Sequence, residues 1–255
     1  MLVKSLRHIK ARLGDGKVTY HWACEQLKSV RQDIVVQHIH NAFALETYET
    51  HARVALEHGD MKEYNQCQTQ VEILHRPPHS LGTERTTAEF AAYRVLYQIY
   101  TRHKYGQSTK ELSAVLAALR PAVLRAPAVI HARKVLRSIE LFDYASFFRL
   151  YKSVPNMGVY LLDLFRDFVR HAALQRLTKA FRPSLALSSV RKAVGMLGDA
   201  CDAAWAEYLK ESGAGLVFVQ GGPGKVDTKA SQPAFAGRFG WAVLEGDNVL
   251  HLEEN

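Results

Sequence analysis

The sequence predicts a mainly α-helical fold: a right-handed helical-repeat solenoid of tetratricopeptide-like type, capped by a C-terminal winged helix. Three observations support this fold class. Apolar residues recur at three- and four-residue intervals from Tyr20 to about Phe181, which is the period of amphipathic helices. Successive helix hairpins are spaced by roughly 35 to 45 residues, as in α-helical repeats. After Pro183 the pattern changes to short helices and short strands.

Three regions are expected from this pattern. Residues 1–154 form the helical-repeat region, and residues 155–232 form a long helix and the winged helix that completes the module. Residues 233–255 are left open, because aromatic residues there suggest packing whereas several glycines suggest irregular chain.

The clearest helix hairpin lies within residues 46–70. Gly59 can adopt the left-handed conformation that ends a helix, and Asp60 is a good N-cap for the next one. One helix therefore ends near His58, and another begins two residues later. Each carries an apolar stripe at helical spacing: Ala52, Ala55 and Leu56 on the first, and Tyr64, Cys67 and Val71 on the second.

Further helices of the repeat region follow from spacing and breakers. Helices are predicted at residues 20–36 and 39–58, and the Pro77–Pro78 pair then ends this part of the chain. The segment 89–100 opens another helix, which Gly106 closes. Its aromatic residues are interpreted as a packing surface rather than a binding platform: Phe90, Tyr93, Tyr97 and Tyr100.

Capping signals place the next helices. Ser108 and Glu111 form a capping box, and Pro121 is expected to terminate the helix that they begin. A helix is predicted at residues 127–140, and Asp143 can cap a short one that ends before Pro155. The short helix presents four aromatic residues on one side: Tyr144, Phe147, Phe148 and Tyr151.

After Pro155 a long helix is expected to run up to Pro183, with six residues on its apolar side: Leu161, Phe165, Phe168, Ala172, Leu177 and Phe181. The segments that follow it are a short strand at 185–187, a helix at 190–197 capped by Ser188 or Ser189, a helix from Asp199 to about Gly213, a strand at 216–219, a turn at 220–225 and a returning strand from Val226. Helix, short strand, two helices and a hairpin together indicate a winged helix.

Composition limits the class of protein. At 255 residues and 47% hydrophobic content, the chain is expected to be a folded, soluble protein. Its three cysteines, Cys24, Cys67 and Cys201, are far apart in helical patterns, which disfavours a disulfide framework and favours a reducing compartment. We expect neither a signal peptide nor a membrane span, because no apolar run approaches the roughly 20 residues that a span requires.

Candidate chemical motifs are weak. The segment 221–224, Gly-Gly-Pro-Gly, lacks the ending of a phosphate-binding loop and is interpreted as the turn of a wing. The pairs His38 with His40 and His75 with His79 have no cysteine or carboxylate array beside them, so no metal site is predicted.

Catalytic motifs are equally weak. A Gly-x-Ser-x-Gly elbow is missing from the sequence. Carboxylate pairs such as Glu46 with Glu49, or Asp163 with Asp167, have the spacing of solvated helix faces. We predict no catalytic residue, no cofactor and no enzymatic activity.

Basic charge is the remaining functional signal. The formal net charge is +8, and the segment 166–192 holds seven basic residues against one acidic residue. Phosphate contact and ordinary solvated surface both remain open for these side chains. Six candidates for nucleic-acid binding flank the start of the winged helix or lie in its wing: Lys179, Arg182, Arg191, Lys192, Lys225 and Lys229.

Seven segments carry a recognisable pattern in this order: Gln26–Asp33, Val36–Ile39, Tyr48–Arg53, Glu63–Gln70, Glu89–Arg94, Phe147–Tyr151 and Lys179–Pro183. From Leu6 to about Leu197 the chain resembles the SAC/GANP family, and most of all its branch typified by leukocyte receptor cluster member eight. Similarity fades after Leu197.

The resemblance implies a PCI module, a non-catalytic scaffold made of helical repeats and a winged helix. It also implies pairing with a second PCI protein, a small acidic subunit of the Sem/DSS type, and binding of RNA, or of DNA, without membrane contact. The implied setting is nuclear mRNA processing and export, with the cytoplasm as a second location. Two alternatives stay open: a free-standing winged-helix protein that binds nucleic acid, and a lid-type scaffold subunit of a proteasome- or signalosome-like assembly.

Overall fold

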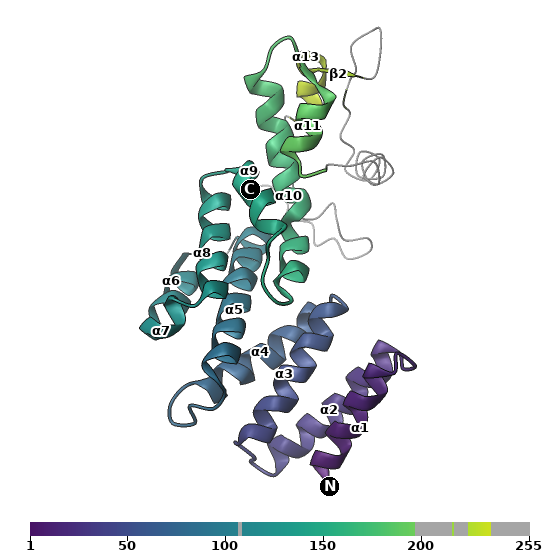
Figure 1. Ribbon diagram of the computed structural model, residues 1–255, viewed down its shortest axis with the longest axis vertical. Helices are drawn as coiled ribbons and strands as arrows, with labels where there is room; N and C mark the ends of the chain where they lie inside the picture. The colour runs from purple at the N-terminus through teal and green to yellow at the C-terminus, as the bar shows by residue number, and fades with distance from the viewer. Residues whose placement is uncertain (107–108, 197–215, 217–223, 236–255) are drawn as a thin grey trace, which may run out of the picture. The chain divides into compact units, whose positions relative to one another are not determined.

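A computed structural model describes residues 1–106, 109–196, 216 and 224–235. In this part of the chain the fold is mainly α-helical, as predicted, with one small antiparallel sheet (Figure 1). Across the same residues, none of the helices combines the length and apolar character needed to cross a bilayer.

The elements are α1 Leu2–Gly14, α2 Tyr20–Val36, α3 Ala42–Glu57, α4 Met61–His75, α5 Glu84–Tyr105, α6 Thr109–Ala117, α7 Pro121–Leu124, α8 Pro127–Glu140, α9 Tyr144–Tyr151, α10 Gly158–Ala180, β1 Ser184–Ala186, α11 Leu187–Ala193, β2 Lys225–Asp227, α13 Thr228–Ser231 and the 3₁₀ helix η1 Gln232–Phe235.

The chain forms two compact units. Unit 1 contains residues 1–98, 110–132 and 154–161, and the other described residues belong to unit 2. Residues of helices α5, α6, α8 and α10 are each divided between the two units, α6 by Thr109 alone. The boundary predicted between residues 154 and 155 stays a prediction.

In unit 1, helices α1 to α4 pack against one another in sequence order. Side-chain caps fix where these helices begin. Thr19 accepts a hydrogen bond from the Trp22 N–H at 3.3 Å, and Asn41 accepts two at the start of α3. Asp60 Oδ1 accepts one from the Glu63 N–H at 3.0 Å, one residue after Gly59 in the left-handed conformation (φ +72°). The predicted hairpin between α3 and α4 is therefore confirmed.

The apolar stripes of this hairpin form the centre of the unit 1 core. Tyr64, Cys67 and Val71 are 0% exposed, and the predicted residues of α3 are also buried. The aromatic stripe on α5 is a packing surface, as predicted. Tyr93 is buried, and its hydroxyl accepts a hydrogen bond from the Met157 N–H at 2.8 Å.

One carboxylate of unit 1 differs from the prediction. Glu49 was expected on a solvated helix face, yet it is only 8% exposed. The guanidinium of Arg53 lies 3.4 Å from it and also donates to Glu89 at 2.9 Å. A buried carboxylate needs such a partner because desolvation of an unpaired charge is costly.

Two groups of buried side chains stand out among the described residues of unit 2. Phe147 on α9 is 0% exposed, and its ring centroid lies 5.1 Å from that of Phe148 and 5.8 Å from that of Phe165. A second cluster joins the later part of α10 to α11 and β2. Its buried members are Ala173, Leu174, Val190, Val194, Met196 and Val226.

A short sheet ties distant segments of unit 2 together. Strand β2 pairs antiparallel with β1, with Leu185 opposite Val226. Just after β2, the Thr228 hydroxyl lies 2.6 Å from the carbonyl oxygen of Phe181 and 2.9 Å from that of Pro183. These bonds attach the start of α13 to the chain that leaves α10.

Two predictions about helix ends are wrong. Pro121 does not simply end a helix: α6 stops at Ala117, and Pro121 begins α7, where its missing N–H costs nothing. Phe181 is not on an apolar helix face, because α10 ends at Ala180 and Phe181 is 46% exposed.

The expected cap of α11 is also wrong. Neither Ser188 nor Ser189 caps this helix, because β1 leads directly into Leu187, whose N–H donates to the Gly224 carbonyl at 2.9 Å. The helix ends at Ala193, and Gly195 follows with φ +74°.

Some predictions fall outside the described residues. They concern Ser108 as a member of the capping box, the helix at 199–213, nearly all of the strand at 216–219, the turn at 220–223, Cys201 and the segment 236–255.

Gly195 gives the first testable prediction. A Cβ atom at this position would lie 2.3 Å from Cδ1 of Phe148, and φ is in the left-handed region. Gly195→Ala is expected to lower the free energy of unfolding by about 2 to 3 kcal/mol, measured by chemical denaturation. Gly14→Ala is the matched control, because a Cβ there meets nothing within 4 Å. An equal effect of the two substitutions would contradict the close approach to Phe148.

Asp143 gives the second prediction. Its Oδ1 caps α9 by accepting the Ser146 N–H at 2.9 Å, and the hydrogen bonds from Ser146 lower the pKa of this carboxyl. Asp143→Ala should cost about 1 kcal/mol of unfolding free energy near neutral pH. The pKa of Asp143 is lower in the folded protein than in the unfolded one. The part of its stabilising effect that depends on its negative charge is therefore complete at pH values above the unfolded pKa, and it is lost as the pH falls through the folded pKa. Denaturation at several pH values measures it, with Asp143→Asn, an uncharged cap, as control. A cost that stays constant down to pH 2 would contradict this mechanism.

Candidate nucleic-acid interface and apolar pocket

All six predicted cations lie in unit 2, on elements that the β1–β2 sheet connects. Lys179 is near the end of α10, and Arg182 follows in the loop to β1. Arg191 and Lys192 occupy the last turn of α11. The other two are in β2 and α13: Lys225 and Lys229.

The hydrogen bonds of this region bring these elements together. The guanidinium of Arg182 donates to Gln232 Oε1 at 2.5 Å, and Thr228 bonds the carbonyl oxygens on either side of Arg182. Lys225 pairs with Ala186, the residue before α11. The structure therefore joins the elements that carry the six cations, which are separated by up to about 50 positions in the sequence.

These side chains are available to solvent. Five of the six are exposed, and Arg191 is half-buried. Asp227 is the one carboxylate in the described segments 179–196 and 224–235, and its Oδ1 already accepts the Ala230 N–H at 2.8 Å. This group of six residues is called the basic cluster below. Within these described segments cations outnumber carboxylates six to one, and such a surplus of positive charge would attract a polyanion.

Other basic residues of the predicted segment have structural roles. Arg166 and Arg170 pair with Asp163 and Asp167 on α10, each with one contact below 3.0 Å. The guanidinium of Arg176 lies 3.9 Å from the ring centroid of Phe142. These arginines are therefore weaker candidates for phosphate contact than the basic cluster.

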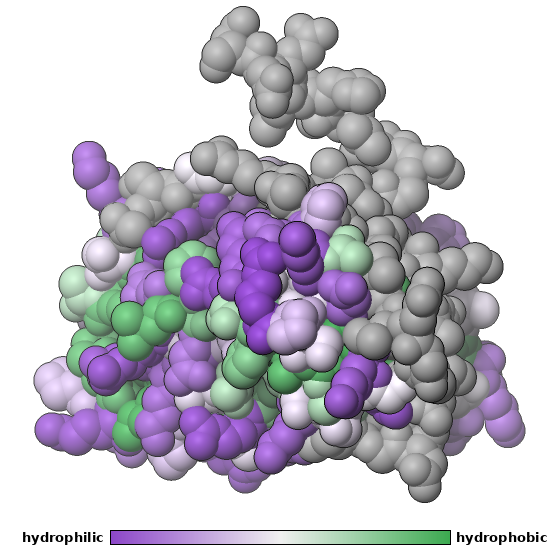
Figure 2. All heavy atoms as spheres, turned by 90° about the horizontal axis from the view of Figure 1, so that it is seen from above, coloured by the Kyte–Doolittle hydropathy of each residue, from purple (hydrophilic) through white to green (hydrophobic). Residues whose placement is uncertain are grey.

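The surface view adds a qualitative point about one face of the protein. Figure 2, turned to look from above on the view of Figure 1, shows hydrophilic side chains interspersed with smaller hydrophobic areas on the described part of this face. That described surface is mixed in polarity, which suits a contact made by charged side chains and also by a few apolar ones.

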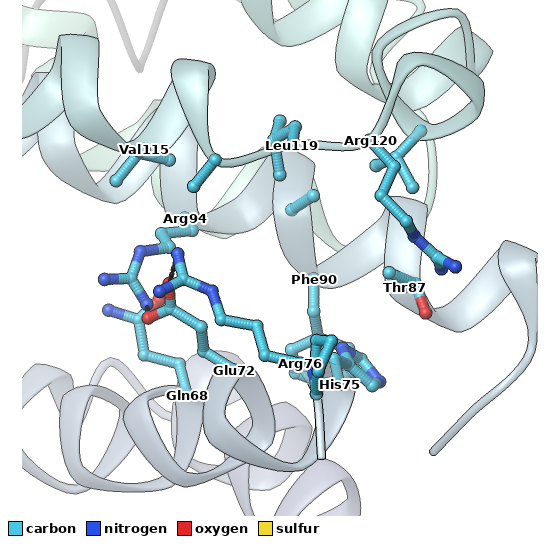
Figure 3. Close-up of a pocket in the computed structure, with 14 residues that line it drawn as sticks. Gln68, Glu72, His75, Arg76, Thr87, Phe90, Arg94, Val115, Leu119 and Arg120 are labelled. Atoms are coloured by element: carbon cyan, nitrogen blue, oxygen red, sulfur yellow. Dashed lines mark ion pairs between the residues drawn. The ribbon is translucent and has the colours of Figure 1, made fainter. Parts of the chain in front are cut away.

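Sequence reasoning missed an apolar pocket in unit 1 (Figure 3). Its volume is about 110 Å³, which suits one apolar side chain of a partner. The pocket lies between α4, α5 and the chain from α6 to α7. Its apolar lining comes mainly from Phe90, Ala91, Val115, Ala118, Leu119 and Val123.

Cations surround this pocket. Arg76 and Arg94 both form ion pairs with Glu72, and Arg120 reaches the pocket from the other side in Figure 3. Burial lowers the pKa of Arg94 from its ordinary value. Three guanidinium groups and one carboxylate leave the edge of the pocket positively charged. The spacing of residues in the sequence could not reveal this pocket, because its lining comes from positions up to about 50 residues apart.

Comparison with known proteins identifies the family of this chain. The model of the SAC3/GANP family matches residues 1–213. The chain belongs to the SAC3/GANP family. The match includes unit 1 and four members of the basic cluster, whereas Lys225 and Lys229 lie beyond it.

Three SAC3/GANP relatives show how far the similarity extends. SAC3 family protein A of Arabidopsis thaliana is 36% identical over 94% of this chain. A THP3 homolog of Schizosaccharomyces pombe is 42% identical over 73% of it, and a leukocyte receptor cluster member 8 homolog of Xenopus laevis is 42% identical over 75%. The chain spans 24%, 45% and 23% of these relatives, respectively. The expected branch is thus among its relatives.

Proposed function

We propose that this SAC3/GANP chain is a non-catalytic PCI scaffold subunit of a nuclear complex of the transcription-export type. In this role it pairs with a second PCI protein and contributes to RNA binding during mRNA processing and export. The observation that carries the proposal is the match of residues 1–213 to the SAC3/GANP family model. Relatives named THP3 homolog and leukocyte receptor cluster member 8 homolog agree with it.

The local architecture supports a PCI module. Consecutive packed helices in unit 1 suit a helical-repeat solenoid. In unit 2, β1, α11 and β2 suit the first strand, first helix and returning strand of a winged helix. The remaining helix and strand of that motif would fall within residues 197–223, which lie almost wholly outside the described part.

The basic cluster supports contact with RNA. Five exposed cations and one half-buried one lie on the elements that the β1–β2 sheet joins. Asp227 is the one acidic residue in the described segments 179–196 and 224–235. Phosphate groups bind such a surface by displacing counterions, without sequence preference. We therefore assign the phosphate contacts to Lys179, Arg182, Arg191, Lys192, Lys225 and Lys229.

The pocket supports contact with a small acidic subunit of the Sem/DSS type. An acidic segment could place one apolar side chain in the pocket and its carboxylates beside Arg76, Arg94 and Arg120. This combination of an apolar anchor and a charged edge is typical of a specific protein interface.

Filling the pocket tests this assignment and gives the third prediction. Ala118 is exposed and lines the pocket, so Ala118→Trp should occupy it without disturbing the core. The affinity for a Sem/DSS-type subunit, measured by calorimetry, is expected to fall at least about tenfold. Ala117→Trp is the matched control, because Ala117 is exposed but does not line the pocket. Equal binding by both variants would place the acidic subunit elsewhere.

The proposed function is tested by purifying the full-length tagged protein from its own cells and identifying bound proteins by mass spectrometry. A second PCI protein, the acidic subunit and RNA are expected together. An isolated monomer that binds RNA would instead support the free-standing nucleic-acid-binding protein. Recovery of proteasome- or signalosome-type subunits without RNA would support the lid-type scaffold.

A further inference from the structure

Three side chains of types that can bind a metal ion meet inside unit 1. His51 comes from α3, while Glu63 and Cys67 are four residues apart on one face of α4. The imidazole, carboxylate and thiol donor atoms all lie within 4.8 Å of one another. The three residues are 0%, 6% and 0% exposed, respectively. Buried convergence of these three donor types from two helices has no role in the function proposed above.

His51 is the unusual member of this group. Both of its ring nitrogens are buried, and neither has a hydrogen-bond partner. Burial and the nearby Arg31 lower the pKa of His51 to about 3, so the ring is neutral and keeps a lone pair for a ligand. A buried polar side chain without a partner calls for an explanation, and a bound ion is one that fits this ring.

A cation already occupies the neighbourhood. The guanidinium of Arg31 on α2 donates to Cys67 Sγ at 2.9 Å and also pairs with Glu63. Lys28 lies 3.4 Å from the same carboxylate. The carboxylate and the sulfur atom therefore face positive charge, as metal ligands do.

Arg31 also has room to leave this position. It lines a broad groove of about 820 Å³, together with polar side chains such as Gln32, Asn65 and Thr69. A guanidinium that rotated into this groove would reach solvent. The three donors would then face the space that it had occupied.

We propose that His51, Glu63 and Cys67 bind one thiophilic divalent cation of the Zn²⁺ type, which exchanges with the Arg31 guanidinium. Nitrogen, sulfur and carboxylate oxygen are the ligands that Zn²⁺ takes in proteins, and water can supply a fourth. On binding, Cys67 loses its thiol proton to solvent. Thiolate and carboxylate then neutralise the two charges of the metal, so Arg31 no longer has a net negative partner and moves into the groove.

The alternative is that Arg31 permanently neutralises Glu63 and that the chain has no affinity for metal here. Burial supports this alternative in one respect, because it raises the pKa of the Cys67 thiol to about 12 and so makes proton loss costly. The metal must offset that cost through its bond to sulfur, as it does at other thiolate sites.

A titration of the reduced full chain with Co²⁺, a spectroscopic substitute for Zn²⁺, separates the two possibilities. The proposal expects one equivalent of Co²⁺ with a thiolate-to-cobalt charge-transfer band in the near ultraviolet, which added Zn²⁺ abolishes. Cys67→Ser should remove the band, and Cys24→Ser, the change of another buried thiol, should retain it. Absence of the band from the wild-type chain, or its persistence in Cys67→Ser, would overturn the proposal.

One further variant tests the exchange with Arg31, and the sulfur band itself distinguishes this site from adventitious binding. Arg31→Gln keeps all three ligands and removes the competing cation, so its affinity for Co²⁺ should rise about tenfold or more, as expected when a competing charge is lost. An unchanged or lower affinity in a folded Arg31→Gln variant also counts against the exchange. The stacked rings of His40 and His79, 4.9 Å apart, could bind surface metal. Such binding would give no sulfur band.

Discussion

Reversing the charge at Lys179, Arg182, Arg191 and Lys192 together, each to glutamate, is expected to weaken binding of single-stranded RNA by about 100-fold or more. Each cation that contacts a phosphate releases counterions, so the loss of four should also make the salt dependence of log K shallower by roughly 3. Filter binding or fluorescence anisotropy at several salt concentrations measures both quantities. The fold should persist, because Lys179, Arg182 and Lys192 are exposed.

A charge-matched control separates the basic cluster from net charge. Glutamate at Lys4, Arg7, Lys17 and Lys62 makes the same change in total charge, from +8 to zero, at exposed positions of unit 1. This control is expected to retain most of the RNA affinity and its salt dependence. If the two quadruple variants behave alike, only net charge matters. Unchanged affinity of the first variant at two salt concentrations would exclude the four residues from the RNA interface.

Replacing Tyr64 with alanine is expected to lower the free energy of unfolding by about 3 to 5 kcal/mol, the range for loss of a buried aromatic ring. Tyr64 is 0% exposed, and its ring centroid lies 5.6 Å from that of Tyr97. Alanine would leave a cavity between α4 and α5 that the surrounding helices can fill only in part. Denaturant-induced unfolding followed by circular dichroism measures the loss.

Tyr64→Phe is the control for this substitution. It keeps the ring and removes only the hydroxyl, which donates to Gln68 at 3.4 Å, so it should cost no more than about 1 kcal/mol. If Tyr64→Ala costs as little as Tyr64→Phe, the ring does not contribute to the core as described. RNA affinity of the folded fraction should not change in either variant, because Tyr64 belongs to unit 1 and the basic cluster to unit 2.

Much of the helical structure could be predicted because its signals are local. The sequence prediction of a helix at 20–36 matches α2, and that at 127–140 matches α8. Caps, left-handed glycines and apolar periodicity act within a few residues, so they can be recognised without the fold. Predictions failed where tertiary contacts replaced a local signal, as where the Gly224 carbonyl, and not Ser188, accepts a hydrogen bond at the start of α11.

The sites depend on contacts between distant segments, and the sequence showed them only in part. The six cations of the basic cluster could be selected from charge alone, but their connection through β1 and β2 could not. The pocket was missed because its lining combines α4, α5 and the chain after α6. Cys67 was predicted only as part of the apolar stripe of its helix, and the four-residue spacing from Glu63 was the one available signal for the cluster with His51. Arg31, which reaches both from α2, gave no such signal.

The pairing of β1 with β2 has a consequence for how this part of the gene can change. The sheet, together with the Thr228 hydrogen bonds, holds the two ends of an intervening segment of about 40 residues at fixed positions. Residues 187–196 of this segment belong to the core and to the basic cluster, because Val190, Val194 and Met196 are buried and α11 carries Arg191 and Lys192. An insertion or an engineered label among them should disturb both. Length variation between the strands is therefore compatible with a constant charged surface only where it leaves these residues and the pairing of β1 with β2 in place.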